Sequence, residues 1–519
     1  MRRFEIHGIP SMRLIGDLSR MNAIRYPDKA ALIMEDVAMT YAELDRRSNA
    51  LAHALIAAGV KPGDRVALLS MNRLEYPIVT QGVAKTGAIL VPLNFRFGAR
   101  EIKYVLSNSE PVCLIMESSY QAVVDEALTD GGLALKRLFI DAPADAPESM
   151  AGIMAAAPIT DPGIDIDPAA PCVIMYTSGT TGFPKGVLVS HNTYYRMYAA
   201  HAIEARLTHL EVFLIAVPMF HAAGMNMALH QTFYLGATGI VHRGKFDVDV
   251  ILGLIQRHRI TLVILVPMTV SLLAHHPRLG EYDLTSLDKI FYGSASITPD
   301  ILNKAREVFP TAKFTQFYGS TEGGMVSVLR SEDHARFSQT SGCQTILSET
   351  RIVKDNGEPA KVGETGEVIV RQCSMGMIGY WRNEKATAET IRNGWIYTGD
   401  LARVEPEGFL TVVDRRSDLI ITGGENVYPR EVELVLAEHP AVREVAVFGV
   451  PDPLYGQSVR AAVALWPDQK VDEKELIEFV RKRIAAYKCP RRVDFHDNLP
   501  RNAADKIQKN ILRQQAESR

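Results

Sequence analysis

The chain has 519 residues, of which 47% are hydrophobic and 23% charged, with 37 glycines and 27 prolines. This composition is typical of a globular protein and excludes a disordered chain, a collagen and a coiled coil. The 57 Lys and Arg residues nearly balance the 60 Asp and Glu residues, and the net charge of −3 excludes a strong global field for nucleic acid or an anionic membrane.

The length, the cysteines and the apolar runs limit the organisation and the compartment. At about 100 to 200 residues per domain, the length predicts about three or four structural units around a large core. The five cysteines are an odd number without a CxxC pair, which indicates a reducing compartment rather than a disulfide or zinc framework. No apolar run approaches the roughly 18 residues of a membrane span, and none of signal-peptide length follows the basic start. We therefore expect a soluble cytoplasmic protein with no membrane span.

Strand and helix patterns alternate over the first 320 residues. Residues 40–43 have the form of a capping box, apolar residues follow at helical spacing, and Gly59 stands where the helix would stop. The alternation favours α/β layers with largely parallel sheets. The predicted strands are 65–70, 88–92, 112–116, 212–218, 261–267 and 313–318.

From about residue 350 the pattern changes to shorter strands rich in turns, which predicts a small β subdomain before a final lobe. In that lobe one helix is predicted between Pro429 and Pro440, and a second begins after Asp472, with Glu475 as its third residue. The predicted strands of the subdomain are 367–371 and 408–413.

We place the main boundary near Asp414, which gives domains of residues 1–414 and 415–519. The predicted fold class is α/β: a large N-terminal lobe of layered α/β sheets with a small β subdomain, then a small mobile α+β lobe. Residues 481–513 of that lobe are rich in Lys and Arg. A compact polyanion could dock there, and a solvated helical face fits the same composition.

The segment 176–186 (Tyr-Thr-Ser-Gly-Thr-Thr-Gly-Phe-Pro-Lys-Gly) carries the strongest chemical signal. Its glycines let backbone N–H groups approach phosphate oxygens, and its lysine supplies positive charge. It is not a Walker A loop, because Pro184 precedes Lys185 and residues 187–189 are predicted to form a strand instead of a helix. The alternative interpretation is a flexible Ser/Gly/Thr hairpin.

This segment resembles the signature loop of the adenylate-forming superfamily, which comprises acyl-CoA synthetases, amino-acid adenylation domains and luciferases. Further resemblances follow in the family's order, so they span nearly the whole chain. They are 318–322 (Tyr-Gly-Ser-Thr-Glu), 397–400 (Tyr-Thr-Gly-Asp), 414–418 (Asp-Arg-Arg-Ser-Asp) with 423–426 (Gly-Gly-Glu-Asn), and 499–502 (Leu-Pro-Arg-Asn) with Lys506.

The resemblance implies a reaction in two halves. A carboxylic acid and ATP form acyl-AMP and pyrophosphate in the large lobe, and the thiol of coenzyme A then takes the acyl group and releases AMP. The implied partners are ATP, Mg²⁺, coenzyme A and a small-molecule carboxylic acid, with no nucleic acid.

The same resemblance assigns the nucleotide contacts. The loop would hold the β- and γ-phosphates, Thr321 the α-phosphate, and Glu322 the Mg²⁺ ion. Glu322 is the only metal ligand assigned, and an ordinary glutamate at a helix start is its alternative interpretation. The residues assigned to ATP or AMP are Thr177, Ser178, Gly179, Thr180, Thr181, Lys185, Gly293, Ser294, Phe317 and Tyr318 (adenine), Thr321, and Asp400 with Arg415 (ribose).

Lys506 resembles the lysine that swings in from the small lobe during adenylation. Ser417 stands at the hinge, where relatives usually place Asp or Lys, and Asp505 stands where they usually have Gly. The residues assigned to coenzyme A are Gly423, Gly424, Lys488 and Arg491. The residues assigned to catalysis are Lys506, Glu322, Thr321 and His221.

The acid pocket is inferred from segments that resemble the family's acyl site. His221 follows Phe220 where amino-acid adenylation relatives place an aspartate, which argues against an amino-acid substrate; a buried core histidine is the alternative. The pocket residues are His221, Gly224, Met268, Gly293, Gly324 and Met325. They are apolar or small around the histidine, so we expect an apolar monocarboxylic acid, either a medium-chain fatty acid or an aromatic acid.

The leading hypothesis is an ATP-dependent acyl- or aryl-CoA ligase. An enzyme that loads a carrier protein is an alternative, and an inactive nucleotide-binding regulator is another, motivated by Ser417 and Asp505. The fold is also that of a luciferase-like oxidase, which no feature requires. The sequence leaves the oligomeric state open, a homo-oligomer included.

Overall fold

The computed structural model describes residues 13–129, 135–177, 184–294, 297–501 and 507–518. The chain divides into two compact units. The first comprises Met1–Ser338, Gln344–Glu349 and Val370–Ile396, and the second comprises Gln339–Cys343, Thr350–Ile369 and Tyr397–Arg519. The boundary predicted near Asp414 lies inside the second unit, at the end of the strand Leu410–Arg415, and stays a prediction.

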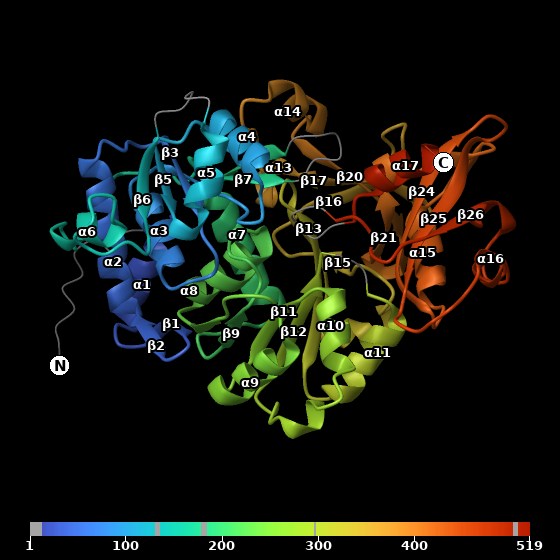
Figure 1. Cartoon of the computed structure of the whole chain (residues 1–519), viewed down its shortest axis with the longest axis horizontal. Coiled ribbons are helices and arrows are strands. Elements are labelled where there is room, and N and C mark those ends of the chain that lie inside the picture. The colour runs from blue at the N-terminus through green and yellow to red at the C-terminus, as the bar shows by residue number, and fades with distance from the viewer. Residues whose placement is uncertain (1–12, 130–134, 178–183, 295–296, 502–506, 519) are drawn as a thin grey trace. The chain divides into compact units, whose positions relative to one another are not determined.

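The first unit contains a seven-stranded sheet in which parallel strands form one side and two antiparallel strands the other (Figure 1). Its parallel part confirms the strands predicted at 65–70, 88–92 and 112–116. Its order is β18 (Gly379–Tyr380), β8 (Lys185–Ser190), β7 (Pro171–Thr177), β4 (Ile89–Pro92), β3 (Arg65–Leu69), β5 (Cys113–Met116) and β6 (Lys136–Phe139).

A second sheet of this unit is also largely parallel, with β14 and β2 antiparallel to their neighbours. The strand predicted at 212–218 ends early, at Ile215, and the one at 261–267 ends at Leu265, where Pro267 opens a helix. The order is β14 (Gly324–Leu329), β13 (Lys313–Ser320), β12 (Lys289–Gly293), β11 (Leu262–Leu265), β9 (Val212–Ile215), β10 (Thr238–Val241), β1 (Ala30–Met34) and β2 (Val37–Thr40); β15 (Cys343–Gln344) follows in sequence.

Helices cover both faces of both sheets. The central core joins residues of the two sheets with α1 (Asp17–Arg25), α2 (Tyr41–Ala57), α3 (Glu75–Lys85), α7 (His191–Glu204), the π-helix η2 (Ala223–His230) and α8 (Gln231–Leu235). A second core packs α4 (Ala99–Ser109) and α5 (Gln121–Ala127) on the outer face of the first sheet. A third packs α9 (Val248–His258), α10 (Pro267–Ala274) and α11 (Pro299–Val308) on the outer face of the second (Figure 1). Shorter helices are α6 (Met150–Ala155), α12 (His334–Phe337), α13 (Gln372–Met375) and α14 (Glu384–Thr390).

The N-cap half of the predicted capping box is confirmed at α2. The Thr40 hydroxyl accepts a hydrogen bond from the Glu43 amide at 3.2 Å, and the helix ends at Ala57, two residues before Gly59. An N-cap of this kind satisfies one of the first amides of the helix, which otherwise lack partners.

The second unit has two small sheets. One contains β16 (Thr350–Val353), β17 (Thr365–Arg371), β20 (Trp395–Val404) and β21 (Leu410–Arg415). The short strand β19 (Ile391–Arg392), which belongs to the first unit, pairs with Trp395 and Ile396 at the start of β20. The strand predicted at 408–413 begins later, at Leu410, because Glu407 and Gly408 have positive φ angles and form the preceding turn.

The other sheet contains β23 (Glu425–Val427), β22 (Ile420–Thr422), β25 (Gly456–Leu465), β24 (Val442–Asp452) and β26 (Arg492–Phe495). The helices α15 (Pro429–Ala437) and α16 (Glu473–Arg481) pack on one face, and α17 (Lys509–Glu517) packs on the other. Both predicted helix starts are confirmed: Pro429 is the first residue of α15, and the Asp472 carboxylate accepts from the Glu475 amide at 2.8 Å.

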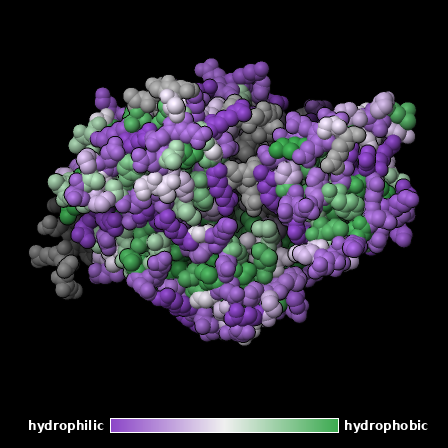
Figure 2. All heavy atoms as spheres, in the orientation of Figure 1, coloured by the Kyte–Doolittle hydropathy of each residue, from purple (hydrophilic) through white to green (hydrophobic). Residues whose placement is uncertain are grey.

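The face of the molecule in Figure 2 is mostly hydrophilic, with smaller hydrophobic patches. Among the residues that the structure describes, none of the helices combines the length and the apolar character needed to cross a bilayer.

Candidate functional site

Two antiparallel hairpins of the first unit carry the two strongest motifs. β7 and β8 form the first, with Thr177 paired to Lys185, and this confirms the predicted strand after the lysine. β13 and β14 form the second, with Ser320 paired to Gly324. Ser178, Gly179, Thr180 and Thr181 of the predicted phosphate loop lie outside the described residues.

Glu322 occupies the turn of the second hairpin, so it is not the helix-start glutamate of the alternative interpretation. Its Oε1 atom accepts a hydrogen bond from the Thr177 hydroxyl at 3.4 Å and one from the Tyr380 hydroxyl at 3.2 Å. The Lys185 ammonium lies 5.1 Å from the centroid of the Tyr380 ring. The fold therefore brings Thr177, Lys185 and Glu322 together, as the sequence predicts, and adds Tyr380.

This carboxylate fits a hard cation. Both hydroxyl donors converge on Oε1, and no described residue donates a hydrogen bond to Oε2. No cluster of three or more His, Cys, Asp or Glu side chains in the described part of the chain could hold a metal by itself. A half-buried carboxylate beside a phosphate-type loop suits Mg²⁺, which takes most of its ligands from water and phosphates.

The predicted adenine contacts separate on the two faces of β13. Phe317 is only 7% exposed, and its ring packs edge-on against Phe291 and His201 at centroid distances of 5.1 and 5.0 Å. Its aromatic face thus belongs to the central core. Tyr318, the next residue, points to the other face and is half-buried. Of the two residues predicted to contact adenine, we therefore keep Tyr318 as the candidate.

Thr321 and Ser294 both lie at the ends of β strands of the second sheet. Thr321 is half-buried in the turn of the second hairpin. Ser294 follows β12 with a φ of 65°, a left-handed conformation that is uncommon for a serine. The preceding Gly293 allows close packing, because a Cβ there would collide with the Phe317 carbonyl oxygen. Such turns at strand ends are where α/β proteins commonly bind ligands.

The residues assigned to the acid pocket differ widely in exposure. His221 is half-buried, and its Nδ1 atom accepts a hydrogen bond from the Ala223 amide at 3.3 Å, which places the proton of a neutral ring on Nε2. Gly224 is the second residue of the π-helix and packs against the backbone of Pro218. Met325 is buried in the core, whereas Met268 is 51% exposed. Gly324, with φ of 68°, packs on the Met375 backbone.

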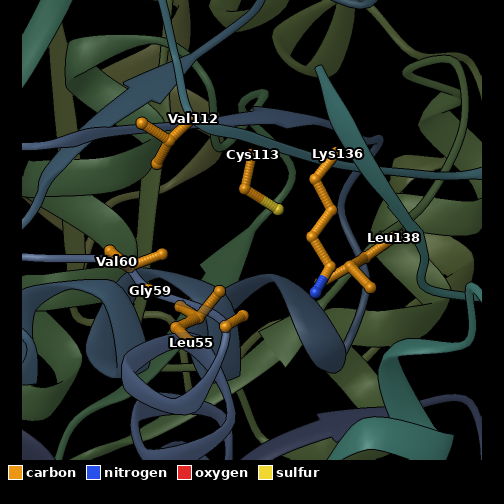
Figure 3. Close-up of a pocket in the computed structure, with 8 residues that line it drawn as sticks. Leu55, Gly59, Val60, Val112, Cys113, Lys136 and Leu138 are labelled. Atoms are coloured by element: carbon orange, nitrogen blue, oxygen red, sulfur yellow. The ribbon is translucent and has the colours of Figure 1, made fainter. Parts of the chain in front are cut away.

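A small pocket of about 50 Å³ lies away from these residues, between the end of α2 and the strands β5 and β6 (Figure 3). Its wall includes Cys113 and Lys136. Burial raises the pKa of Cys113 to about 12, so the thiol is neutral at ordinary pH. This small pocket contains none of the predicted site residues, and its size suits water rather than an organic acid.

The two residues assigned to ribose, Asp400 and Arg415, lie in the second unit. Asp400 and Arg415 are cross-strand neighbours on β20 and β21, and the Arg415 Nε atom lies 3.3 Å from Asp400 Oδ1. Asp400 is 7% exposed, and its amide donates to the Thr398 hydroxyl at 3.1 Å. A buried carboxylate with a fixed cationic neighbour can accept from two vicinal hydroxyls.

Of the four residues assigned to coenzyme A, three lie together, namely Gly423, Gly424 and Arg491. Gly423 and Gly424 make the two-residue turn between β22 and β23, and both have positive φ, at 59° and 85°. The Gly423 amide donates to the Tyr455 carbonyl at 2.8 Å, and the Arg491 guanidinium stacks 3.7 Å from the Tyr455 ring centroid. Tyr455 thus joins the glycine turn to Arg491, which the sequence does not indicate.

Lys488 stands apart from that group. Its ammonium makes two contacts of 2.7 Å with the Glu431 carboxylate, so its charge is already compensated. Ser417 is exposed in a short 3₁₀ turn, Arg416–Asp418, directly after β21. Lys506 and Asp505 lie outside the described residues.

The chain matches two family models. The model for the AMP-binding enzyme matches residues 20–381, and the model for the AMP-binding enzyme C-terminal domain matches residues 431–506. Together they cover most of the chain and leave residues 382–430 between them unmatched.

Among curated proteins, the chain is similar to feruloyl-CoA synthase of Amycolatopsis sp, with 38% identity over 488 residues, 94% of this chain and 96% of that protein. It is 34% identical to the fatty acid–[acyl-carrier-protein] ligase ScoC of Streptomyces coeruleorubidus, covering 97% and 96% of the two chains. Among solved structures it resembles o-succinylbenzoate CoA synthetase from Bacillus subtilis in complex with the acyl-adenylate intermediate OSB-AMP. The TM-score is 0.85, at 32% identity and with coverage of 95% and 97%.

Proposed function

Because the chain belongs to the AMP-binding enzyme family and is an acyl-CoA synthetase of the adenylate-forming superfamily, we propose that it couples an apolar monocarboxylic acid to coenzyme A. In the first half-reaction a carboxylate oxygen attacks the α-phosphorus of ATP, the bond to the bridging oxygen breaks, and pyrophosphate leaves. In the second, the sulfur of coenzyme A attacks the acyl carbonyl, the thiol proton passes to solvent, and AMP leaves with the former carboxylate oxygen.

The observation that carries this proposal is the group formed by Lys185, Tyr380, Glu322 and Thr177. The first half-reaction brings two anions together, so it needs a cation for the polyphosphate and a hard oxygen ligand beside it. Lys185 supplies the cation, and Glu322 supplies the ligand. Lys185 follows a loop whose composition suits phosphate, and Glu322, in the turn of the second hairpin, accepts a hydrogen bond from Thr177, which precedes that loop. When bound, Mg²⁺ would reduce the repulsion between carboxylate and polyphosphate, held on the protein side by Glu322.

The remaining nucleotide roles rest on the resemblance and on the local geometry. Thr321, in the turn beside Glu322, would donate its hydroxyl to the α-phosphate. Tyr318 would stack on adenine, and the Asp400 carboxylate would accept from the ribose hydroxyls beside Arg415. Lys506 would bridge the carboxylate and the α-phosphate in the first half-reaction.

The second half-reaction would use residues of the C-terminal segment other than Lys506. The turn at Gly423 and Gly424 has no Cβ atoms, so a pantetheine chain could pass close to its backbone. Arg491, held over Tyr455, would meet a phosphate of coenzyme A. Lys488 is the weaker candidate because Glu431 already compensates its charge. Ser417 would be the hinge between the two half-reactions.

The acid is expected to be apolar, with one carboxylate. Apart from His221, the residues assigned to the pocket are methionines and glycines, and the Nε2–H of His221 would donate to an oxygen of the acid. The names of the reported relatives include aromatic and fatty acids, and the chain is most similar in identity to the feruloyl-CoA synthase among the three. We therefore place aromatic acids first and medium-chain fatty acids second.

A carrier protein as acyl acceptor is the second candidate function. The 34% identity to a fatty acid–[acyl-carrier-protein] ligase over 97% of this chain favours it. The first half-reaction would be the same, and only the thiol would differ.

The test is pyrophosphate release from ATP and Mg²⁺ with a panel of aryl, arylalkanoic and fatty acids. Each acid is incubated with coenzyme A, with a phosphopantetheinylated carrier protein, or without a thiol, and the thioester is identified by mass. Multiple turnovers that need coenzyme A, with acyl-CoA as product, support the ligase. Turnover only with the carrier protein supports the second candidate. ATP binding without pyrophosphate release for any acid contradicts both.

A further inference from the structure

Tyr380 contacts both charged groups of the phosphate-binding site in the first unit. Its hydroxyl donates to the Glu322 carboxylate at 3.2 Å, and its ring carries the Lys185 ammonium at 5.1 Å from the centroid. Among the described residues, no ion pair joins Lys185 directly to Glu322. The Tyr380 side chain thus contacts the Lys185 ammonium with its ring and the Glu322 carboxylate with its hydroxyl.

The backbone fixes the position of this tyrosine. Tyr380 belongs to β18 and pairs with Val187 of β8, the strand that begins with Lys185. The Tyr380 amide donates to the Thr387 hydroxyl at 2.9 Å, and the Trp381 amide donates to the Gly186 carbonyl at 2.7 Å. The ring is therefore positioned by the same hairpin that carries the lysine.

The interactions on the two sides of the tyrosine are different in kind. An ammonium over an aromatic face is attracted to the electron-rich ring but keeps its donors available. A hydroxyl donor to one carboxylate oxygen orients the carboxylate and leaves the other oxygen for a ligand.

A direct ion pair would have the opposite effect. A lysine and a carboxylate in contact neutralise each other, and both would then be less available to an anionic phosphate and to a cation. The side chains of Lys185 and Glu322 both contact the same tyrosine, one at its ring and the other at its hydroxyl.

We propose that Tyr380 is a positioning residue that keeps Lys185 and Glu322 apart and holds the Glu322 carboxylate oriented for the metal that accompanies ATP. The inference rests on the proposed function, because it takes the ligand to be a metal–ATP complex. Its tests measure binding rather than turnover, so they can be read even if no acid supports pyrophosphate release.

The first test uses Tyr380→Phe, which keeps the ring and removes the hydroxyl. We expect the Kd of Mn²⁺ in the presence of ATP, measured by electron paramagnetic resonance, to rise about tenfold, because a hydrogen bond to a charged group is lost. The Kd of metal-free ATP, measured by calorimetry, should change by less than about twofold, because the cation–π contact remains. Wild-type Mn²⁺ affinity in this variant would overturn the proposal.

The matched control is Tyr282→Phe. The Tyr282 hydroxyl also donates to a carboxylate, Asp249, at 2.7 Å, at a place that has no assigned role in binding. The control loses the same chemical group and should leave both Kd values unchanged. Equal losses of Mn²⁺ affinity in Tyr282→Phe and Tyr380→Phe would overturn the proposal.

The second test removes the ring. In Tyr380→Leu, we expect Lys185 to pair with Glu322 and the Kd of metal-free ATP to rise about fivefold. Adding Glu322→Gln in the Tyr380→Leu background removes the competing anion and should recover most of that affinity. If the double variant binds metal-free ATP as weakly as Tyr380→Leu alone, the ring does not separate the charges and the proposal fails.

Discussion

Asp400 and Arg415 face each other on β20 and β21, and their geometry supports the residue-scale prediction for ribose binding. The carboxylate is buried and lies 3.3 Å from the guanidinium. The substitution Asp400→Asn removes the negative charge of the carboxylate that would accept from the ribose hydroxyls, and it keeps the size of the side chain. We expect kcat/KM for ATP to fall about 10- to 100-fold, since charge-assisted hydrogen bonds of this kind contribute about 1.5–3 kcal/mol. Initial rates of pyrophosphate release against ATP concentration measure the effect.

Glu405→Gln is the control for this substitution. Glu405 lies after β20, where it accepts from Arg403 and Thr411, so it is a paired carboxylate of the same sheet. We expect kcat/KM for ATP in Glu405→Gln to stay within about twofold of wild type. An unchanged kcat/KM for ATP in Asp400→Asn would contradict the assignment of Asp400 to the ribose site.

Single residues show how far the sequence could predict the site. Thr177, Lys185 and Glu322 were predicted as one group from motifs far apart in the chain, and the fold brings them together. Tyr380 was missed because its only sequence signal would be the pairing of β18 with β8, which depends on tertiary structure. Phe317 was assigned to adenine with its neighbour, but strand alternation sends one of two consecutive residues into the core.

At the scale of elements, α7 and the π-helix η2 hold buried neutral histidines. Burial lowers the pKa of His191 and His201 to about 4 and that of His230 to about 3, from an ordinary value of 6.5. The unfolded chain binds these protons more readily than the folded one. Their contribution to stability is therefore present above about pH 6.5 and is lost as the pH falls toward about 4.

We predict that the free energy of unfolding decreases with falling pH in this window, by up to about 1.4 kcal/mol per pH unit for each histidine. In His191→Gln part of this slope should disappear, because glutamine does not titrate. Its side-chain oxygen can still accept the hydrogen bond that the Ile15 amide donates to His191. Urea unfolding at several pH values, followed by circular dichroism, measures the slope. The control is His209→Gln, whose ring is exposed. An unchanged slope in His191→Gln would contradict the prediction.

The hairpin of β13 and β14 depends on Gly324, which combines a φ of 68° with close packing. A Cβ at this position would collide with the Met375 carbonyl oxygen, so the turn that carries Glu322 would have to move. We expect Gly324→Ala to lower the free energy of unfolding by about 1–3 kcal/mol and to reduce pyrophosphate release. Thermal unfolding and initial rates measure the two effects.

Gly357→Ala separates the two causes of this loss. Gly357 also has a positive φ, of 83°, but a Cβ there would meet no atom within 4 Å. It should show only the cost of the backbone conformation, about 1 kcal/mol. If Gly324→Ala is no more destabilising than Gly357→Ala and keeps wild-type rates, the hairpin tolerates a side chain and the account of this turn is wrong.

The strands and capped helices were predictable from local patterns, whereas the π-helix was not. β3, β4 and β5 are buried apolar runs, and α2 and α16 have side-chain caps, which are local signals. The π-helix depends on contacts distant in sequence: the His230 ring bonds to Thr80 and Tyr198, and the Tyr198 hydroxyl donates to Asn226. No short pattern contains such a network.

At the scale of the whole molecule, the proposed reaction assigns its two halves to different segments of the chain. Lys506 lies outside the described residues, and its role rests on the resemblance. We predict that Lys506→Ala abolishes acid-dependent pyrophosphate release but still converts supplied acyl-AMP to acyl-CoA. Lys470→Ala, an exposed lysine of the same unit, should behave as wild type. Undiminished pyrophosphate release by Lys506→Ala would refute the assignment.

The central claim is that this acyl-CoA synthetase forms an acyl-adenylate before the thiol reacts. The most direct test is acid-dependent exchange of labelled pyrophosphate into ATP without coenzyme A, together with the nucleotide formed when coenzyme A is added. The account predicts exchange that needs the acid and Mg²⁺ but no thiol, and AMP as the nucleotide product. Exchange that requires coenzyme A, or ADP and inorganic phosphate as products, would contradict it.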